Sequence, residues 1–143
     1  MKELEKKQIE EMIDKAINMM DYSYVPYSHF HVGAALLAKN GTVYGGCNIE
    51  NAGYTPSNCA ERTAFFKAVS EGEREFEAIC IIGGKNGVAS GVTAPCGVCR
   101  QVMREFCNPS TFRIILPDGA DFYQEFLLEE LFPLSFGLEN LLD

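Results

Sequence analysis

Three cysteines and one glutamate are the residues of this chain whose types and spacing predict chemistry. Cys96 and Cys99 are three positions apart, and Glu61 follows Cys59 by two positions. Three thiolates leave one tetrahedral position of Zn²⁺ open, which is typical of a catalytic zinc site. A carboxylate beside a metal-activated water is placed to accept its proton and pass it on. The pattern therefore predicts a catalytic zinc centre with Cys59, Cys96 and Cys99 as ligands and Glu61 as the catalytic residue.

The elements around these residues are expected to place the thiols at the starts of two helices. One helix is predicted over residues 59–71, with Asn58 as its N-cap and Gly72 as its C-terminal stop. The other is predicted over residues 96–106. The positive end of a helix lowers the pKa of a thiol and favours the thiolate, which is the form that binds metal. Three thiolates make the site negative, so Arg62 is expected to donate a hydrogen bond to a ligating sulfur.

The remaining pattern predicts one domain, residues 1–143, of the α/β class. The expected elements are a helix at residues 4–20, strands at 32–38, 42–49, 76–84 and 112–116, and a last helix at 125–132. The first two strands are joined by Asn40-Gly41, which is a strong hairpin signal. The order of these elements predicts a three-layer sandwich with a mixed sheet around one core.

Composition and charge argue against several classes of protein. The 143 residues are 47% hydrophobic, which is enough to fill one core. No apolar run reaches the roughly 18 residues of a membrane span. The 12 Lys and Arg are outnumbered by 20 Asp and Glu, and the net charge of −8 disfavours a nucleic-acid substrate. Residues 1–7 are charged with no apolar stretch after them, so we expect no secretory signal and a cytoplasmic location.

The two cysteine motifs resemble those of the cytidine deaminase family. They read Cys59-Ala60-Glu61-Arg62-Thr63-Ala64 and Pro95-Cys96-Gly97-Val98-Cys99-Arg100-Gln101. The likeness extends to Phe30-His31-Val32-Gly33-Ala34, Asn48-Ile49-Glu50-Asn51-Ala52 and Phe136-Gly137. Position 59 is Cys, whereas many relatives that act on RNA and DNA have His there. The chain is therefore similar to the three-cysteine, homotetrameric branch that acts on free nucleosides.

The resemblance implies a fold, a cofactor and a reaction. The fold is a three-layer α/β/α sandwich with a mixed five-stranded sheet, and the cofactor is one Zn²⁺ per chain. The reaction is hydrolytic deamination of cytidine and deoxycytidine to uridine and deoxyuridine, a step of pyrimidine salvage. Glu61 would move the protons between water, the cytosine ring and the leaving ammonia.

The same resemblance implies which residues contact the nucleoside. Asn48 and Glu50 are expected to bind the ribose hydroxyls, because an amide and a carboxylate together donate to and accept from a diol. The other implied contacts are Phe30 and Phe136 around the cytosine ring, Tyr54 at the 5′ end of a nucleoside in a neighbouring subunit, and Ala60.

The C-terminal residues 127–142 are rich in Leu and Phe. If they form a helix, it is apolar over most of its surface and must bury more than one face. A subunit interface is one place to bury it, which agrees with a homotetramer whose active sites are shared through Phe136. The alternative is that this tail packs on its own domain.

Four other interpretations fit parts of the cysteine pattern. A thioredoxin-like redox pair would explain Cys96 and Cys99 but needs no third thiol or adjacent acid. A structural zinc site needs a fourth protein ligand. The candidates for that ligand are Cys47, Cys80, Cys107, His29 and His31. An aminonucleoside-antibiotic deaminase would share both motifs, although residues 48–51 favour an ordinary ribose. A zinc-stabilised binding protein would show no turnover.

Overall fold

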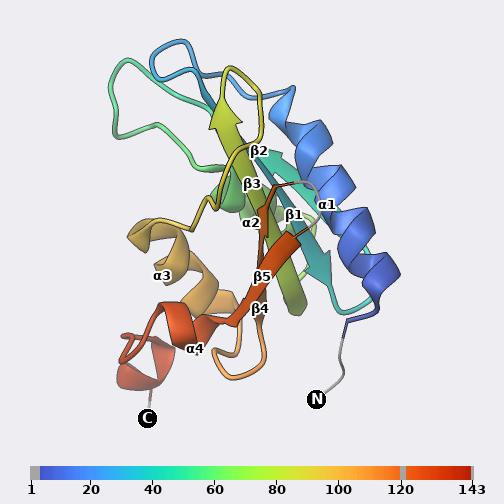
Figure 1. Cartoon of the computed structure of the whole chain (residues 1–143). Helices are drawn as coiled ribbons and strands as arrows, with labels where there is room; N and C mark the ends of the chain where they lie inside the picture. The colour runs from blue at the N-terminus through green and yellow to red at the C-terminus, as the bar shows by residue number, and fades with distance from the viewer. Residues whose placement is uncertain (1–3, 120–121, 143) are drawn as a thin grey trace.

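A five-stranded sheet forms the centre of the computed structural model, which describes residues 4–119 and 122–142 (Figure 1). The strands are β1 (Phe30–Ala38), β2 (Val43–Cys47), β3 (Phe76–Lys85), β4 (Arg113–Asp118) and β5 (Phe122–Leu127). Their order in the sheet is β2-β1-β3-β4-β5. The β3–β4 pair is parallel and the other pairs are antiparallel. The mixed five-stranded sheet is therefore confirmed.

Helices cover the two faces of this sheet. Helix α1 (Lys6–Met20) lies on one face, and α2 (Ala60–Ser70) and α3 (Gly97–Phe106) lie on the other (Figure 1). Alternate residues of β1 separate the two cores: Leu36 packs with the residues of α2 and α3, and Leu37 packs with those of α1. Successive strand residues point to opposite faces, so a strand buried on both sides reads as a continuous apolar run. The three-layer sandwich predicted from the sequence is confirmed.

The local turn signals of the sequence are also confirmed. The amide of Ala38 donates to the carbonyl of Thr42 at 2.9 Å, which closes the hairpin between β1 and β2. Gly41 has a φ of +93°, and Gly72, just after α2, has a φ of +98°. Both are left-handed conformations that glycine adopts without the steric penalty of a Cβ.

The expected N-cap of α2 is wrong by one residue, because Cys59 rather than Asn58 occupies that position. The backbone of Asn58 pairs with Ile49, with N–O distances of 2.8 and 2.9 Å. Its side-chain amide donates to the hydroxyl of Thr63 at 3.1 Å. Asn58 is therefore tied to the preceding loop, and the helix begins one residue later.

The helix expected over residues 125–132 is also wrong. Strand β5 continues to Leu127, and α4 (Leu128–Leu131) is a single turn that precedes Pro133. β5 is an edge strand whose first four residues are exposed. Its sequence therefore lacks the alternation of apolar and polar residues that identifies a half-buried strand. The tail then continues to a short 3₁₀ helix, η1 (Leu138–Asn140), and does not form one long apolar helix.

Two further observations concern the N-terminal residues and the length of the helices. Residues 1–3 of the charged N-terminal run lie outside the described residues. Within the described residues, no helix is long and apolar enough to cross a membrane.

Candidate active site

The three cysteines lie together between the N-termini of α2 and α3. Their Sγ atoms are all within 4.8 Å of one another, and those of Cys59 and Cys96 are 3.7 Å apart. Zn–S bonds of about 2.3 Å in tetrahedral geometry place two sulfurs about 3.8 Å apart. Cys59 and Cys96 are the N-caps of their helices, and Cys99 lies in the first turn of α3. The donor set therefore fits one Zn²⁺, with both helix dipoles favouring thiolates.

Arg62 lies beside this cluster, where it can offset the negative charge. Its Nη2 atom is 3.3 Å from the sulfur of Cys59. The pKa of the Cys59 thiol is lowered to about 5, first by a hydrogen bond from Cys99 and then by Arg62. The hydrogen bond with Cys59, together with burial, raises the pKa of Cys99. Within the described residues, Nε of Arg62 is buried without a hydrogen-bond partner. Burying this atom costs desolvation free energy, which the attraction between the guanidinium and the thiolate sulfurs can offset.

Glu61 is almost completely buried, with 4% of its surface exposed. It lies in the first turn of α2, beside Cys59. Burial raises its pKa to about 7, and the charge of Cys59 adds to the effect. A carboxyl group with a pKa near the working pH can both accept and donate a proton, which is the property of a general acid–base group.

The described cysteine cluster has three members. The five residues considered as a fourth ligand lie outside it: Cys47, Cys80, Cys107, His29 and His31. Burial raises the pKa of the Cys80 thiol to about 12, as in an ordinary core cysteine. Nδ1 of His31 lies 3.1 Å from the carbonyl oxygen of Met20. The cluster therefore leaves a fourth position open for a non-protein ligand, as a catalytic zinc site does.

A pocket of about 360 Å³ contains two of the residues predicted to bind substrate. Its lining residues are Tyr27, Ser28, Glu50, Asn51, Tyr54 and Ser57. Oε1 of Glu50 accepts hydrogen bonds from the backbone amides of Tyr27 and Ser28, at 3.0 and 3.1 Å. Hydrogen bonds from the Ser28 side chain and from both amides hold the pKa of Glu50 below its usual value. Tyr27 acts through its backbone amide and Ser28 through both its side chain and its amide, and neither belongs to a side-chain motif that marked it in the sequence.

Asn48 is tied to the strand that carries Phe30. Its Nδ2 donates to the carbonyl of Phe30 at 2.8 Å, and its Oδ1 accepts from the amide of Val32 at 2.9 Å. The last residue pair of the β1–β2 ladder is Gly33 and Cys47. The side-chain amide of Asn48, the next residue, continues this pairing by hydrogen bonds to the backbone of β1. Asn48 thus holds the chain at Phe30, whose ring packs against the core beside α2.

Phe136 lies in a different place from the other substrate candidates. Its side chain is 57% exposed, and it lines a pocket of about 370 Å³ with residues of α3 and the C-terminal tail. Glu50 and Tyr54 do not line that pocket. Tyr54 is 80% exposed with a φ of +58°, whereas Ala60 is fully buried at the start of α2. One chain therefore does not bring Phe136 and Glu50 into one pocket.

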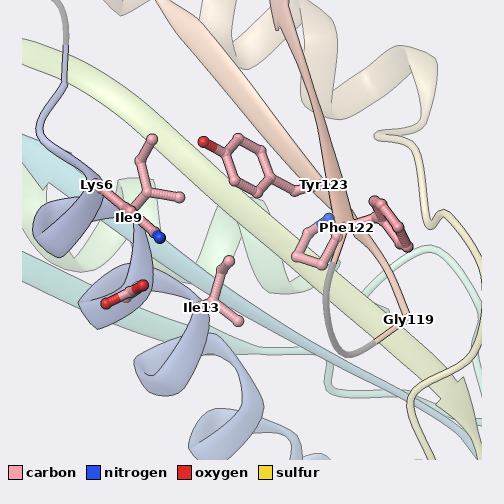
Figure 2. A pocket seen from close by; sticks show the side chains of 8 residues that line it. Lys6, Ile9, Ile13, Gly119, Phe122 and Tyr123 are labelled. Atoms are coloured by element: carbon pink, nitrogen blue, oxygen red, sulfur yellow. The ribbon is translucent and has the colours of Figure 1, made fainter.

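Another pocket, of about 270 Å³, lies between α1 and the β4–β5 hairpin (Figure 2). Figure 2 shows Ile9 and Ile13 of α1 on one side and Tyr123 of β5 on the other. None of the residues predicted to bind zinc or substrate lines it.

Comparisons with known proteins agree with the geometry of the cysteine cluster. Residues 6–114 match the family model of the cytidine and deoxycytidylate deaminase zinc-binding region. The chain is 47% identical to a cytidine deaminase of Sporosarcina psychrophila, over 93% of this chain and 94% of that protein. It is 38% identical to a probable cytidine deaminase of Dictyostelium discoideum, over 97% and 90%. The crystal structure of cytidine deaminase from Burkholderia pseudomallei superposes with a TM-score of 0.81 at 42% identity, covering 89% of this chain and 98% of that one.

Proposed function

The chain belongs to the cytidine and deoxycytidylate deaminase family, and from this premise we propose that it hydrolyses cytidine and deoxycytidine to uridine and deoxyuridine with release of ammonia. The observation that carries the proposal is the cluster of three thiols beside the buried carboxyl group of Glu61. We assign the whole chain, residues 1–143, to one catalytic domain.

Cys59, Cys96 and Cys99 would hold the zinc ion. When bound, zinc supplies Lewis-acid activation of water near neutral pH. Arg62 would reduce the negative charge of the three thiolates by donating to the sulfur of Cys59. A less negative ligand set leaves the metal a stronger Lewis acid, so Arg62 supports the chemistry without touching the substrate.

Glu61 would carry each proton of the reaction. It accepts a proton from the attacking water and donates it to N3 of cytosine while the water oxygen bonds to C4. It then accepts the proton of the new C4 hydroxyl and donates it to the amino nitrogen. The C4–N bond breaks, ammonia leaves, and C4 keeps the oxygen as a carbonyl group. A pKa of about 7 suits a group that must gain and lose a proton twice in each turnover.

Glu50 and Asn48 would bind the ribose. Backbone amides occupy Oε1 of Glu50, so Oε2 is the oxygen that we assign to a sugar hydroxyl. One hydrogen of the Asn48 amide is used by the carbonyl of Phe30, and the second is available to a hydroxyl oxygen. Because both side chains are fixed by the protein before substrate binds, little side-chain entropy is lost on binding.

The active site would be shared within a homotetramer. Phe136 is exposed and lies outside the pocket of Glu50, which supports its closing over a cytosine bound to a neighbouring chain. Tyr54 would reach the 5′ end of a neighbour's nucleoside, while Phe30 and Ala60 would contact the base in their own subunit. Leu141 and Leu142 are 75% and 65% exposed, and such apolar surface is typical of an interface.

The setting we propose is pyrimidine salvage in the cytoplasm, with free nucleosides rather than nucleic acid as substrates. The net charge of −8 supports this, since a polyanionic substrate would be repelled.

The direct test is release of ammonia from cytidine by protein containing about one zinc per chain. The matched control is Glu61→Gln, which preserves shape but cannot carry a proton. We expect turnover by the natural chain on the scale of about 1 to 10³ s⁻¹, a typical range for enzymes. Zinc-loaded protein that releases no ammonia from cytidine or deoxycytidine would refute the proposal.

A further inference from the structure

Helix α3 holds the C-terminal segment, residues 131–139, through one side of its surface. Arg104 follows Arg100 by four positions and Gln101 by three, so its side chain lies next to both on the helix surface. Their contacts are Arg100 with the carbonyl of Leu131, Gln101 Nε2 with the carbonyl of Phe136 at 2.9 Å, and Arg104 Nε with the hydroxyl of Ser135 at 2.8 Å. The segment is therefore fixed by hydrogen bonds to the same helix that presents Cys96 and Cys99.

Arg104 contacts the chain on both sides of Phe136. Its side chain is 10% exposed, and it donates to Ser135 and forms an ion pair with Glu139. The hydrogen bond from Arg104 holds the pKa of Glu139 below its usual value. A Cβ on Gly137 would lie 2.4 Å from Cζ of Arg104, so the guanidinium packs directly against the backbone that follows Phe136.

These contacts fix the backbone of Phe136 while its ring stays exposed. The carbonyl of Phe136 binds Gln101, and both neighbouring residues contact Arg104, yet 57% of its side chain is open to solvent. Ordering a surface segment costs conformational entropy, which the observed hydrogen bonds and ion pair offset. The result is an aromatic side chain held in place but not covered by its own chain.

Resting on the proposed function, we propose that Arg104 and Gln101 are positioning residues that set the place of the Phe136 ring for substrate binding. They touch neither the metal ligands nor the substrate and act through Phe136. Helix α3 then has two tasks: its N-terminus supplies Cys96 and Cys99 to one active site, and its later turns hold Phe136 for the site of a neighbouring subunit.

A fluorescence measurement tests the positioning without any enzyme assay. The chain has no tryptophan, so Phe136→Trp introduces a single indole emitter. Adding Arg104→Met or Gln101→Met should raise acrylamide quenching of this tryptophan about twofold or more, because the segment loses its anchors and opens locally. The matched control is Arg113→Met, which removes an ion pair with Glu125 from a side chain that is 14% exposed and lies in β4. It should leave the quenching unchanged.

Kinetics with cytidine then test whether the positioning acts through the ring. Arg104→Met should raise KM about tenfold, with kcat and zinc content changed much less, because the ring contacts the base in both ground and transition states. Phe136→Ala is expected to be inactive alone, so in that background the effect is measured on the dissociation constant of cytidine. Arg104→Met should change this constant by less than about twofold, since the group it positions is gone.

The outcomes separate the two proposals. Unchanged quenching and KM in both Arg104→Met and Gln101→Met, or a full tenfold effect without the Phe136 ring, would overturn the positioning role. A natural chain that does not deaminate cytidine would refute the proposed function, and the quenching measurement would still decide whether Arg104 and Gln101 fix residue 136. Gln101 is exposed, so its variant provides the test even if Arg104→Met does not fold.

Discussion

Replacing Gly46 with alanine is expected to lower the activity strongly, although Gly46 is not among the residues that we assign to zinc or to substrate. Gly46 lies in β2 under α2, and a Cβ there would be 2.4 Å from the carbonyl oxygen of Ala60 and 2.6 Å from the backbone nitrogen of Ala64. Ordinary contact begins at 3.4 Å, so the first turn of α2 must move by about 1 Å. That turn carries Glu61 and follows directly on Cys59.

The size of the effect follows from this displacement. Misplacing a catalytic group by about 1 Å costs on the order of 10²-fold in rate, so kcat/KM should fall about 100-fold. Forcing an extra methyl group into a packed core costs about 1–3 kcal/mol of stability. The melting temperature should fall by roughly 4 °C for each kcal/mol in a chain of this size. Ammonia release, zinc content and thermal melting measure the three quantities.

Gly45→Ala is the matched control, because Gly45 directly precedes Gly46 in the same strand and faces the other side of the sheet. Its Cβ would meet Sδ of Met19 at 2.7 Å and Cε of Lys15 at 2.8 Å. Both are atoms of flexible side chains that can move aside at low cost, so activity should stay within about threefold of the natural chain. If Gly46→Ala is equally active, the close packing of β2 under α2 does not set the position of Glu61.

Three further predictions concern the roles assigned to individual residues. Replacing any one of the three clustered cysteines with alanine should remove zinc and activity together, and zinc content measured by atomic absorption at one per chain in all three variants would contradict their assignment. Glu61→Gln should keep zinc and nucleoside binding but lose at least about 10²-fold in turnover, and a loss of twofold or less would show that Glu61 is not the proton carrier. Neither Glu61→Gln nor Phe136→Ala should be active alone. A mixture of the two that exchanges subunits should regain activity, since some sites then combine an intact Glu61 with a neighbour's Phe136. Subunit exchange without recovery of activity would argue against a shared site.

The sequence alone determined those features that depend on neighbours a few residues away. The spacing of Cys96 and Cys99 puts both thiols on the same side of a helix that starts there, because residues three positions apart are neighbours on a helix surface. Asn40-Gly41 specified the hairpin, and Gly72 specified the end of α2, because the left-handed conformation is cheap for glycine alone. The buried strands were visible as apolar runs.

Only the tertiary structure decided features whose partners are distant in the sequence. Cys59 and Cys96 are 37 residues apart, and they meet because α2 and α3 both pack on the same face of the sheet. The fifth strand could not be located from its residues, because it is an exposed edge strand whose pairing with β4, rather than its own burial, makes it a strand.

The surroundings of the candidate site depend on tertiary structure for the same reason. The amide of Asn48 is fixed by the backbone of β1, the carboxylate of Glu50 by two amides more than 20 residues earlier, and Phe136 by α3. Several of these bonds involve backbone groups, which every residue type carries, so the residue types alone do not reveal the partners. The sequence by itself determined which side chains are able to do the chemistry, and long-range packing decided where each of them is held.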